Sequence, residues 1–220
     1  MKQVLFILLI TFISRSIFAQ GLTKNGQITS TGSSFVDKNG AIGASTGVDK
    51  NGKIVAASLA VGSDYQGGKI LYFFVSGDPG YVAGQQHGLI AATSDLSIAQ
   101  WGCYGTAVTG TVAGIGYGNA NTVNIVAGCA TAGIAARLCS DLVLNSYSDW
   151  YLPSINELII FQANQAIIGG YDAANHYWSS TEESNAFNAR SYAYIRTVSN
   201  TTSAGGKNDP RFAVRPIRTF

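Results

Sequence analysis

The sequence predicts an α+β domain, because blocks of strand-like and helix-like pattern follow one another along the chain. Residues 69–75 show the pattern of a buried strand and follow Gly67-Gly68, and residues 87–92 are placed to pair back on it as a hairpin. Two stretches with apolar residues at helical spacing follow. The last part of the chain has strand patterns at residues 177–181, 187–198 and 211–218. This order is typical of an α+β domain, which we place at residues 65–220.

The first helical stretch covers about residues 121–144. Gly128 and Gly133 each disfavour a helix by roughly 1 kcal/mol relative to Ala, so a break near Gly128 stays open. The apolar stripe that predicts the helix consists of Val123, Ala127, Ala130, Ile134, Leu138 and Leu142.

The second helix starts with a capping box. Ser154 is the expected N-cap and Glu157 follows three residues later, with Pro153 just outside the helix. Gly169-Gly170 marks the end of the helical pattern.

Side chains of two kinds alternate along residues 187–198, which predicts a strand with two different faces. One face is small and mostly apolar. The other carries our candidate ligand-binding side chains, Arg190, Tyr192, Tyr194 and Arg196. Tyrosine rings stack on sugars, and guanidinium groups pair with sulfate or carboxylate. Arg211, Arg215 and Arg218 would extend this face if the last strand is its neighbour. The alternatives are a solvated face, or a face buried by the second helix or by a partner subunit.

Residues 1–19 are typical of a secretory signal peptide. Lys2 precedes an apolar run that is too short to span a bilayer comfortably, and Ala19 offers a small residue for cleavage. An uncleaved membrane anchor is the alternative. We expect the mature chain to be secreted or to lie on the extracellular side of the cell surface, with no membrane span.

Charge argues against a nucleic-acid binder. The full chain has 14 Lys and Arg against 12 Asp and Glu, and Lys2 and Arg15 would leave with the signal peptide. The mature chain is then close to neutral, whereas nucleic-acid binding requires a basic surface. Cations do gather from residue 190 onward, and such a patch could attract an acidic polysaccharide. The alternative is that these side chains are scattered over different faces of the domain.

Residues 20–62 form a distinct N-terminal arm. Asn-Gly recurs at 25–26, 39–40 and 51–52, and each pair is a strong hairpin signal. Because few large apolar side chains lie between the turns, the arm is either a β-rich stalk that self-associates or a flexible linker.

Three cysteines in an exported chain suggest one disulfide and one remaining thiol. Cys103 and Cys129 flank a Gly-rich loop, and we expect them to pair. Cys139 falls in a helical pattern, where a buried thiol behaves as a small hydrophobic group.

No catalytic or metal-binding signature is present in the sequence. His87 and His176 lie in no hydrolase motif, and no Cys or His pair has metal-ligand spacing. A calcium site at Glu182, Glu183 and Asp172 is possible, but an exposed charged turn explains these residues equally well. We therefore expect neither an enzyme nor a cofactor.

Three segments resemble the Lcl C-terminal domain family, named after a collagen-like bacterial surface adhesin. They are Ser148-Asp149-Trp150-Tyr151-Leu152-Pro153-Ser154-Ile155-Asn156-Glu157-Leu158, Tyr177-Trp178-Ser179-Ser180-Thr181-Glu182 and Val214-Arg215-Pro216-Ile217-Arg218. The resemblance covers residues 65–220 and implies a C-type-lectin-like fold used for display and binding. The collagen stalk and the sugar-binding segments of calcium-dependent lectins are absent.

The residues of these segments also have structural explanations. Trp150, Leu152 and Trp178 should fill the core, since indoles bury a large area when the ring N–H finds an acceptor. We expect Asp149 and Arg215 to form a buried pair.

The sequence thus favours a non-catalytic module for surface recognition or adhesion, binding an extracellular glycan, acidic or sulfated, or a surface protein. The alternative is a structural subunit of a cell-surface assembly that forms homo-oligomers through its arm.

Overall fold

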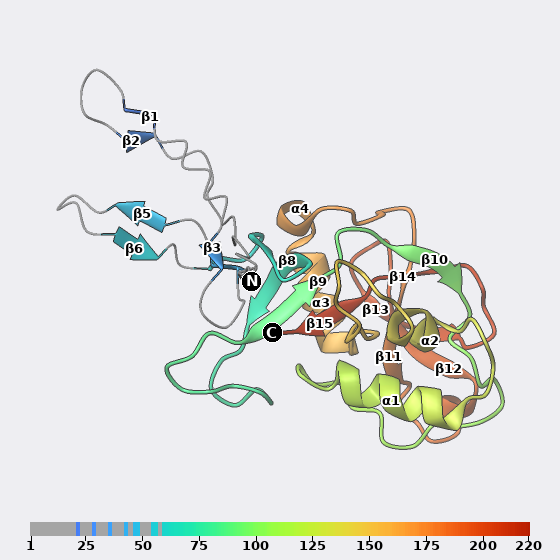
Figure 1. Cartoon of the computed structure of the whole chain (residues 1–220). Coiled ribbons are helices and arrows are strands. Elements are labelled where there is room, and N and C mark those ends of the chain that lie inside the picture. Colours follow the sequence, from blue (N-terminus) through green and yellow to red (C-terminus); the bar gives the residue numbers. More distant parts are fainter. Residues whose placement is uncertain are drawn as a thin grey trace, which may run out of the picture. The chain divides into compact units, whose positions relative to one another are not determined.

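The computed structural model describes residues 59–220 continuously and, before them, only short strands between Gly21 and Ala56 (Figure 1). The chain divides into two compact units, residues 1–57 and 58–220. The predicted signal peptide lies outside the described residues. Within the part of the chain that is described, no helix is long and apolar enough to cross a membrane.

The described strands of the first unit pair around the Asn-Gly sequences. They are β1 (Gly21–Leu22) with β2 (Ile28–Thr29), β3 (Phe35–Val36) with β4 (Ile42–Gly43), and β5 (Thr46–Val48) with β6 (Ile54–Ala56), all antiparallel. Each pair encloses one Asn-Gly, although the turns themselves lie outside the described residues. Self-association of the arm stays a prediction.

The second unit contains a sheet with the order β15-β9-β8-β7. Its strands are β7 (Asp64–Tyr65), β8 (Gly68–Phe73), β9 (Gly88–Ala91) and β15 (Ile217–Thr219), and all neighbours are antiparallel. The hairpin expected between residues 69–75 and 87–92 is confirmed. Because β15 pairs with β9, the beginning and the end of this unit lie in one sheet (Figure 1).

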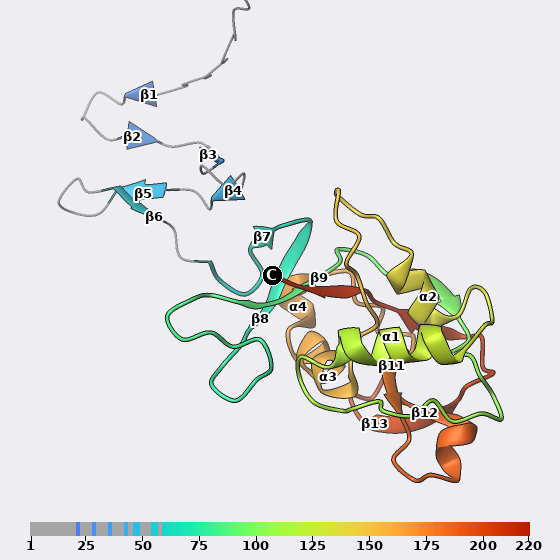
Figure 2. The same cartoon turned by 60° about the horizontal axis from the view of Figure 1, so that its bottom comes forward.

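A second sheet has the order β10-β14-β11-β12-β13. Its strands β11, β12 and β13 are labelled in Figure 2. Its strands are β10 (Leu96–Ala99), β11 (Tyr177–Glu182), β12 (Tyr192–Arg196), β13 (Thr202–Gly206) and β14 (Phe212–Val214). Only the β11–β14 pair is parallel. The unit is therefore α+β, as predicted, with one antiparallel and one mixed sheet.

Two predicted strands were too long. Residues 211–218 divide into β14 and β15, which belong to different sheets, because Pro216 cannot donate to a ladder and Arg215 turns into the core. Residues 187–198 begin with a 3₁₀ turn, η1 (Asn188–Arg190), and only Tyr192–Arg196 are strand. The Asn185 side chain accepts the amides of Phe187 and Asn188 and thereby favours the turn.

The helical stretch 121–144 is not one helix. Helix α1 (Gly118–Gly128) ends at the first of the two weak glycines, and α2 (Ala135–Ser140) starts after Gly133, whose φ is +70°. The Arg137 side chain donates to the carbonyls of Val126 and Cys129, which satisfies the end of α1. The second predicted helix is present as α3 (Ile155–Ala163), followed by the short α4 (Gln165–Ile168).

Trp150, Leu152 and Trp178 occupy the core as predicted, and Trp101 is buried with them. All four side chains are almost fully buried. The ring N–H of Trp178 donates to the Ala99 carbonyl at 2.8 Å, and that of Trp101 to the Ser179 carbonyl at 2.8 Å. Each indole can therefore be buried without an unpaired polar atom.

The predicted capping box is confirmed, and its glutamate also binds a loop outside the helix. Ser154 accepts the Glu157 amide, and Glu157 accepts the Ser154 amide at 2.7 Å. Its other oxygen accepts the Gly116 amide at 2.8 Å, so the carboxylate also holds the loop before α1. Gly118 must lack a side chain, because a Cβ there would collide with this carboxylate.

We expect the unfolding free energy to depend on pH through Glu157. Burial raises the pKa of this carboxyl to about 7, although the backbone hydrogen bonds act in the opposite direction. Folded protein then binds a proton that the unfolded chain has lost between about pH 4.5 and 7, so stability should fall as pH rises through this window. Denaturant unfolding at several pH values measures the effect. The Glu157→Gln variant is the control, and a dependence as steep as in the wild type would contradict the assignment.

The predicted disulfide joins Cys103 and Cys129, and Cys139 is buried as a free thiol. Reduction should destabilise the protein by roughly 3 kcal/mol, because the bond closes a loop with a sequence separation of 26. A thiol reagent should label one cysteine after unfolding and none before. The Cys139→Ala variant should lose that label and keep the reduction effect, whereas three labelled thiols in unfolded, unreduced wild-type protein would argue against the bond.

Candidate functional site

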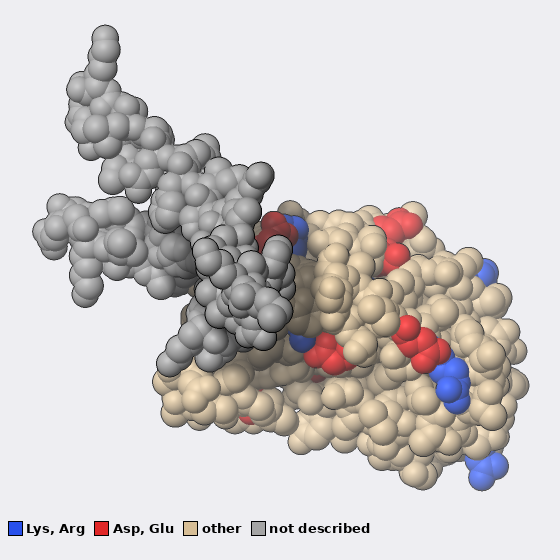
Figure 3. Space-filling view, viewed as in Figure 1, with Lys and Arg blue, Asp and Glu red and all other residues tan. Residues whose placement is uncertain are grey.

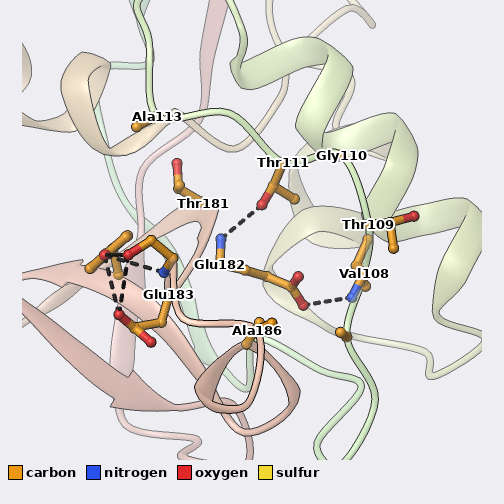
Figure 4. A pocket seen from close by; sticks show the side chains of 13 residues that line it. Val108, Thr109, Gly110, Thr111, Ala113, Thr181, Glu182, Glu183 and Ala186 are labelled. Atoms are coloured by element: carbon orange, nitrogen blue, oxygen red, sulfur yellow. Dashed lines mark hydrogen bonds between the residues drawn. The ribbon is translucent and has the colours of Figure 1, made fainter.

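A pocket of about 380 Å³ opens where the loop before α1 meets the end of β11 (Figure 4). The loop forms one wall, with residues 107–111 and Ala113. The other wall comes from residues 181–184 at the end of β11, with Ala186, Ala189 and Tyr194. Two segments that lie far apart in the sequence, residues 107–113 and 181–194, thus build one site.

Glu182 and Lys207 make the base of the pocket rigid. The Lys207 ammonium is fully buried, forms an ion pair with Glu182 and donates to the Thr106 carbonyl at 2.9 Å. It also lies 4.4 Å from the centre of the Trp101 ring. Burial lowers the pKa of Lys207, and the hydrogen bond to Glu182 acts in the opposite direction. A buried ion pair with further partners holds its groups in one geometry.

Glu182 also attaches the loop to the strand. Its carboxylate accepts the Val108 amide at 2.7 Å, and its own amide donates to the Thr111 hydroxyl at 3.1 Å (Figure 4). Both walls of the pocket are therefore connected through one residue. The shape of the pocket should persist without a ligand, which lowers the entropy cost of binding.

The rim carries a cluster of polar groups. The Tyr194 hydroxyl lies 2.9 Å from the Ser184 hydroxyl and 3.4 Å from a carboxylate oxygen of Glu183. The second oxygen of Glu183 accepts the Asn185 amide at 3.1 Å. With the threonine side chains at 109 and 111, the pocket presents hydroxyl groups beside one partly exposed carboxylate. The third threonine of the lining, Thr181, is buried, and its hydroxyl is paired with the Ile155 amide and the Val112 carbonyl.

Neither histidine lines this pocket. His87 contacts the Phe220 carbonyl at 3.1 Å, and His176 accepts the Val198 amide at 3.2 Å. Within the described residues, no group of three or more His, Cys, Asp or Glu side chains could hold a metal ion. The calcium alternative at Glu182, Glu183 and Asp172 is not supported, because Glu182 is committed to Lys207.

The predicted arginine and tyrosine face is not assembled. Arg196 lies in β12 as expected, but it is buried and donates to Gln162, Asn200 and Thr202. The last strand is not its neighbour, since β11 lies between β12 and β14. On the side of the molecule seen in Figure 3, charged side chains are scattered over a mostly uncharged surface.

Arg215 and Arg218 are also buried, each with a carboxylate. Arg215 pairs with Asp95 at 2.6 Å, donates to the carbonyls of Ala92 and Gly170 and lies over the Phe161 ring. The predicted pair of Asp149 with Arg215 is therefore wrong. Asp149 instead accepts two hydrogen bonds from Arg218, at 2.7 and 2.8 Å. These arginines act as core residues.

The other candidate residues are dispersed. Arg190 is exposed on η1, and Tyr192 is 43% exposed at the start of β12. Arg211 is exposed and paired with Asp209. Of the seven candidates, only Tyr194 lines the pocket beside Glu182.

The sequence predicts only a Gly/Thr-rich loop for residues 102–118, which include the wall formed by residues 107–113. One signal could have located the site. Glu182 ends a strand that begins with Tyr177 and Trp178, two side chains that favour burial, and a buried carboxylate requires a cation. The position of that cation, Lys207, could not be read from spacing.

Comparisons with known proteins identify no relative of this chain. No family model matches the chain, no curated protein matches it, and no solved structure matches it.

We expect Arg215 and Arg211 to differ sharply in stability measurements. Arg215→Ala should lower the unfolding free energy by about 3–5 kcal/mol, because Asp95 loses its cation and keeps only the Tyr177 hydroxyl as a partner, and the carbonyls of Ala92 and Gly170 lose their donor. Arg211→Ala should leave the denaturation midpoint unchanged, since exposed ion pairs contribute little. Urea unfolding of both variants measures the difference, and equal midpoints would contradict the burial of Arg215.

Proposed function

We propose that this chain is an exported, non-catalytic recognition module that binds a saccharide in the pocket beside Glu182. One observation carries the proposal, namely that hydroxyl groups, a carboxylate and a tyrosine surround a pocket with a rigid base. Sugar hydroxyls both donate and accept hydrogen bonds, and such groups complement them. The Tyr194 ring adds an apolar surface on which a sugar can pack.

We further propose that residues 65–220 adopt the C-type-lectin-like fold that the resemblance implies. Support comes from the sheet shared by the beginning and end of the unit, from the second sheet, and from the helices α1 and α3 between its strands in the sequence. The three resembling segments also converge. The Ser180 amide donates to the Pro153 carbonyl, and the Ile217 amide to the Tyr151 carbonyl.

The charges of the pocket favour a neutral or amine-bearing sugar over a sulfated one. Glu182 is neutralised by Lys207, which leaves the Glu183 carboxylate at the rim. The buried arginines offer no cationic surface for sulfate. A negative rim repels anions and attracts ammonium groups.

Binding of the chain from residue 20 to residue 220 to neutral, amino, carboxylated and sulfated polysaccharides tests the proposal. Tyr194→Ala should abolish measurable binding, and Glu183→Gln should weaken it roughly five-fold, the equivalent of about one hydrogen bond. Tyr192→Ala is the matched control, because this tyrosine is on the same strand but does not line the pocket, and it should bind like the wild type.

Two outcomes would contradict the saccharide proposal. One is salt-sensitive binding to sulfated polysaccharides alone that is lost in the Arg190→Ala variant. This result would place the binding site at the exposed Arg190 and not in the pocket. If folded protein binds no polysaccharide but forms oligomers that disappear when residues 20–57 are removed, the alternative of a structural subunit is favoured.

A further inference from the structure

Strand β13 is an edge of the five-stranded sheet and has a regular ladder. It pairs with β12 through five consecutive residues without a bulge. Just beyond the ladder, the Thr197 amide donates to Thr201 and the Lys207 amide donates to Ser191. Because hydrogen-bonded pairs alternate in an antiparallel ladder, residues 201, 203, 205 and 207 face β12. The backbone groups of Thr202, Ala204 and Gly206 therefore point away from the sheet.

This edge lacks the usual protection against strand addition. Thr202, Ser203 and Ala204 are exposed, and the strand contains no charged residue and no proline. Of the three outward residues, only Gly206 has a backbone partner among the described residues, since its carbonyl accepts the Asp209 amide at 2.8 Å. The amide and carbonyl of Ala204 remain available for an added strand.

A polar pocket of about 470 Å³ lies beside this edge and shares Ser203 and Ala204 with it. His176 and Arg211 also line the pocket. The Nδ1 atom of His176 accepts the Val198 amide at 3.2 Å, so Nε2 carries the proton of the neutral ring. Arg211 uses Nε and Nη2 on Asp209, and its Nη1 has no partner in the described part of the chain.

The donors of this pocket favour a carboxylate. His176 Nε2, Arg211 Nη1 and the Ser203 hydroxyl can each donate, and a carboxylate accepts several hydrogen bonds at once. Asp209 balances the charge of Arg211, so recognition would rest on directed donors more than on net charge. Side chains of an added strand that lie on the Ser203 side of the sheet would reach this pocket.

We infer that β13 accepts an extended segment of a partner protein, and that an acidic side chain of this segment enters the pocket lined by His176 and Arg211. Backbone hydrogen bonds to Ala204 would supply affinity, and the pocket would supply specificity, as in other cases of strand addition. This interaction does not depend on saccharide binding, because the two pockets share no residue.

Synthetic peptides of alternating Thr and Val, with Glu, Gln or Lys at the centre, test the inference on the chain from residue 20 to 220. Fluorescence anisotropy should show that the Glu peptide binds roughly ten-fold more tightly than the Lys peptide. Arg211→Gln should remove this preference. In amide hydrogen exchange, the Glu peptide should protect Thr202 and Ala204.

The Ala204→Pro variant tests whether peptide binding depends on the free backbone amide at the β13 edge. Ala204→Pro removes an outward amide and leaves the hydrogen bonds to β12 in place, so peptide binding should be lost while the melting temperature stays close to that of the wild type. Ala204→Ser keeps the amide and should bind normally. The inference is overturned if Ala204→Pro binds as well as Ala204→Ser, if no peptide binds at about 1 mM, or if the edge is protected by self-association.

Discussion

Strand β11 buries four polar side chains in succession, and the rest of the domain depends on how they are satisfied. Ser179 donates to the Tyr194 carbonyl, Ser180 accepts from Asn121 on α1, and Thr181 accepts the Ile155 amide at the start of α3. Glu182 binds Lys207 and Val108. An unpaired polar group in the core would cost several kcal/mol, so β11 requires all these elements in place.

The same constraint shapes the candidate site. Since Glu182 is the last residue of β11, its need for a cation brings Lys207 beneath the loop that forms the pocket wall. The rim groups, Glu183 and Tyr194, lie one step outside this buried network and keep access to solvent. The structure thus places solvent-accessible hydrogen-bonding groups on a base held by a buried ion pair and its hydrogen bonds, an arrangement that favours ligand binding.

Arginines near the C-terminus illustrate how composition can mislead. Their density suggested a cationic surface, yet Arg196, Arg215 and Arg218 are buried. Each binds a side chain from a distant segment, namely Gln162, Asp95 and Asp149 respectively. A guanidinium group has five donors in a fixed plane, and can therefore bridge several loops at once. In this domain, hydrogen bonds from these guanidinium groups connect loops that no regular secondary structure joins.

The sequence by itself determined the features that depend on neighbours along the chain. These are the α+β class, the hairpin of β8 and β9, the Ser154 capping box, and the pairing of Cys103 with Cys129. Tertiary structure alone decided the partners of buried charges, because Asp95 and Arg215, or Glu182 and Lys207, meet only after the sheets have formed. Periodicity records which side of an element is apolar, but the identity of a distant partner depends on the packing of the whole domain.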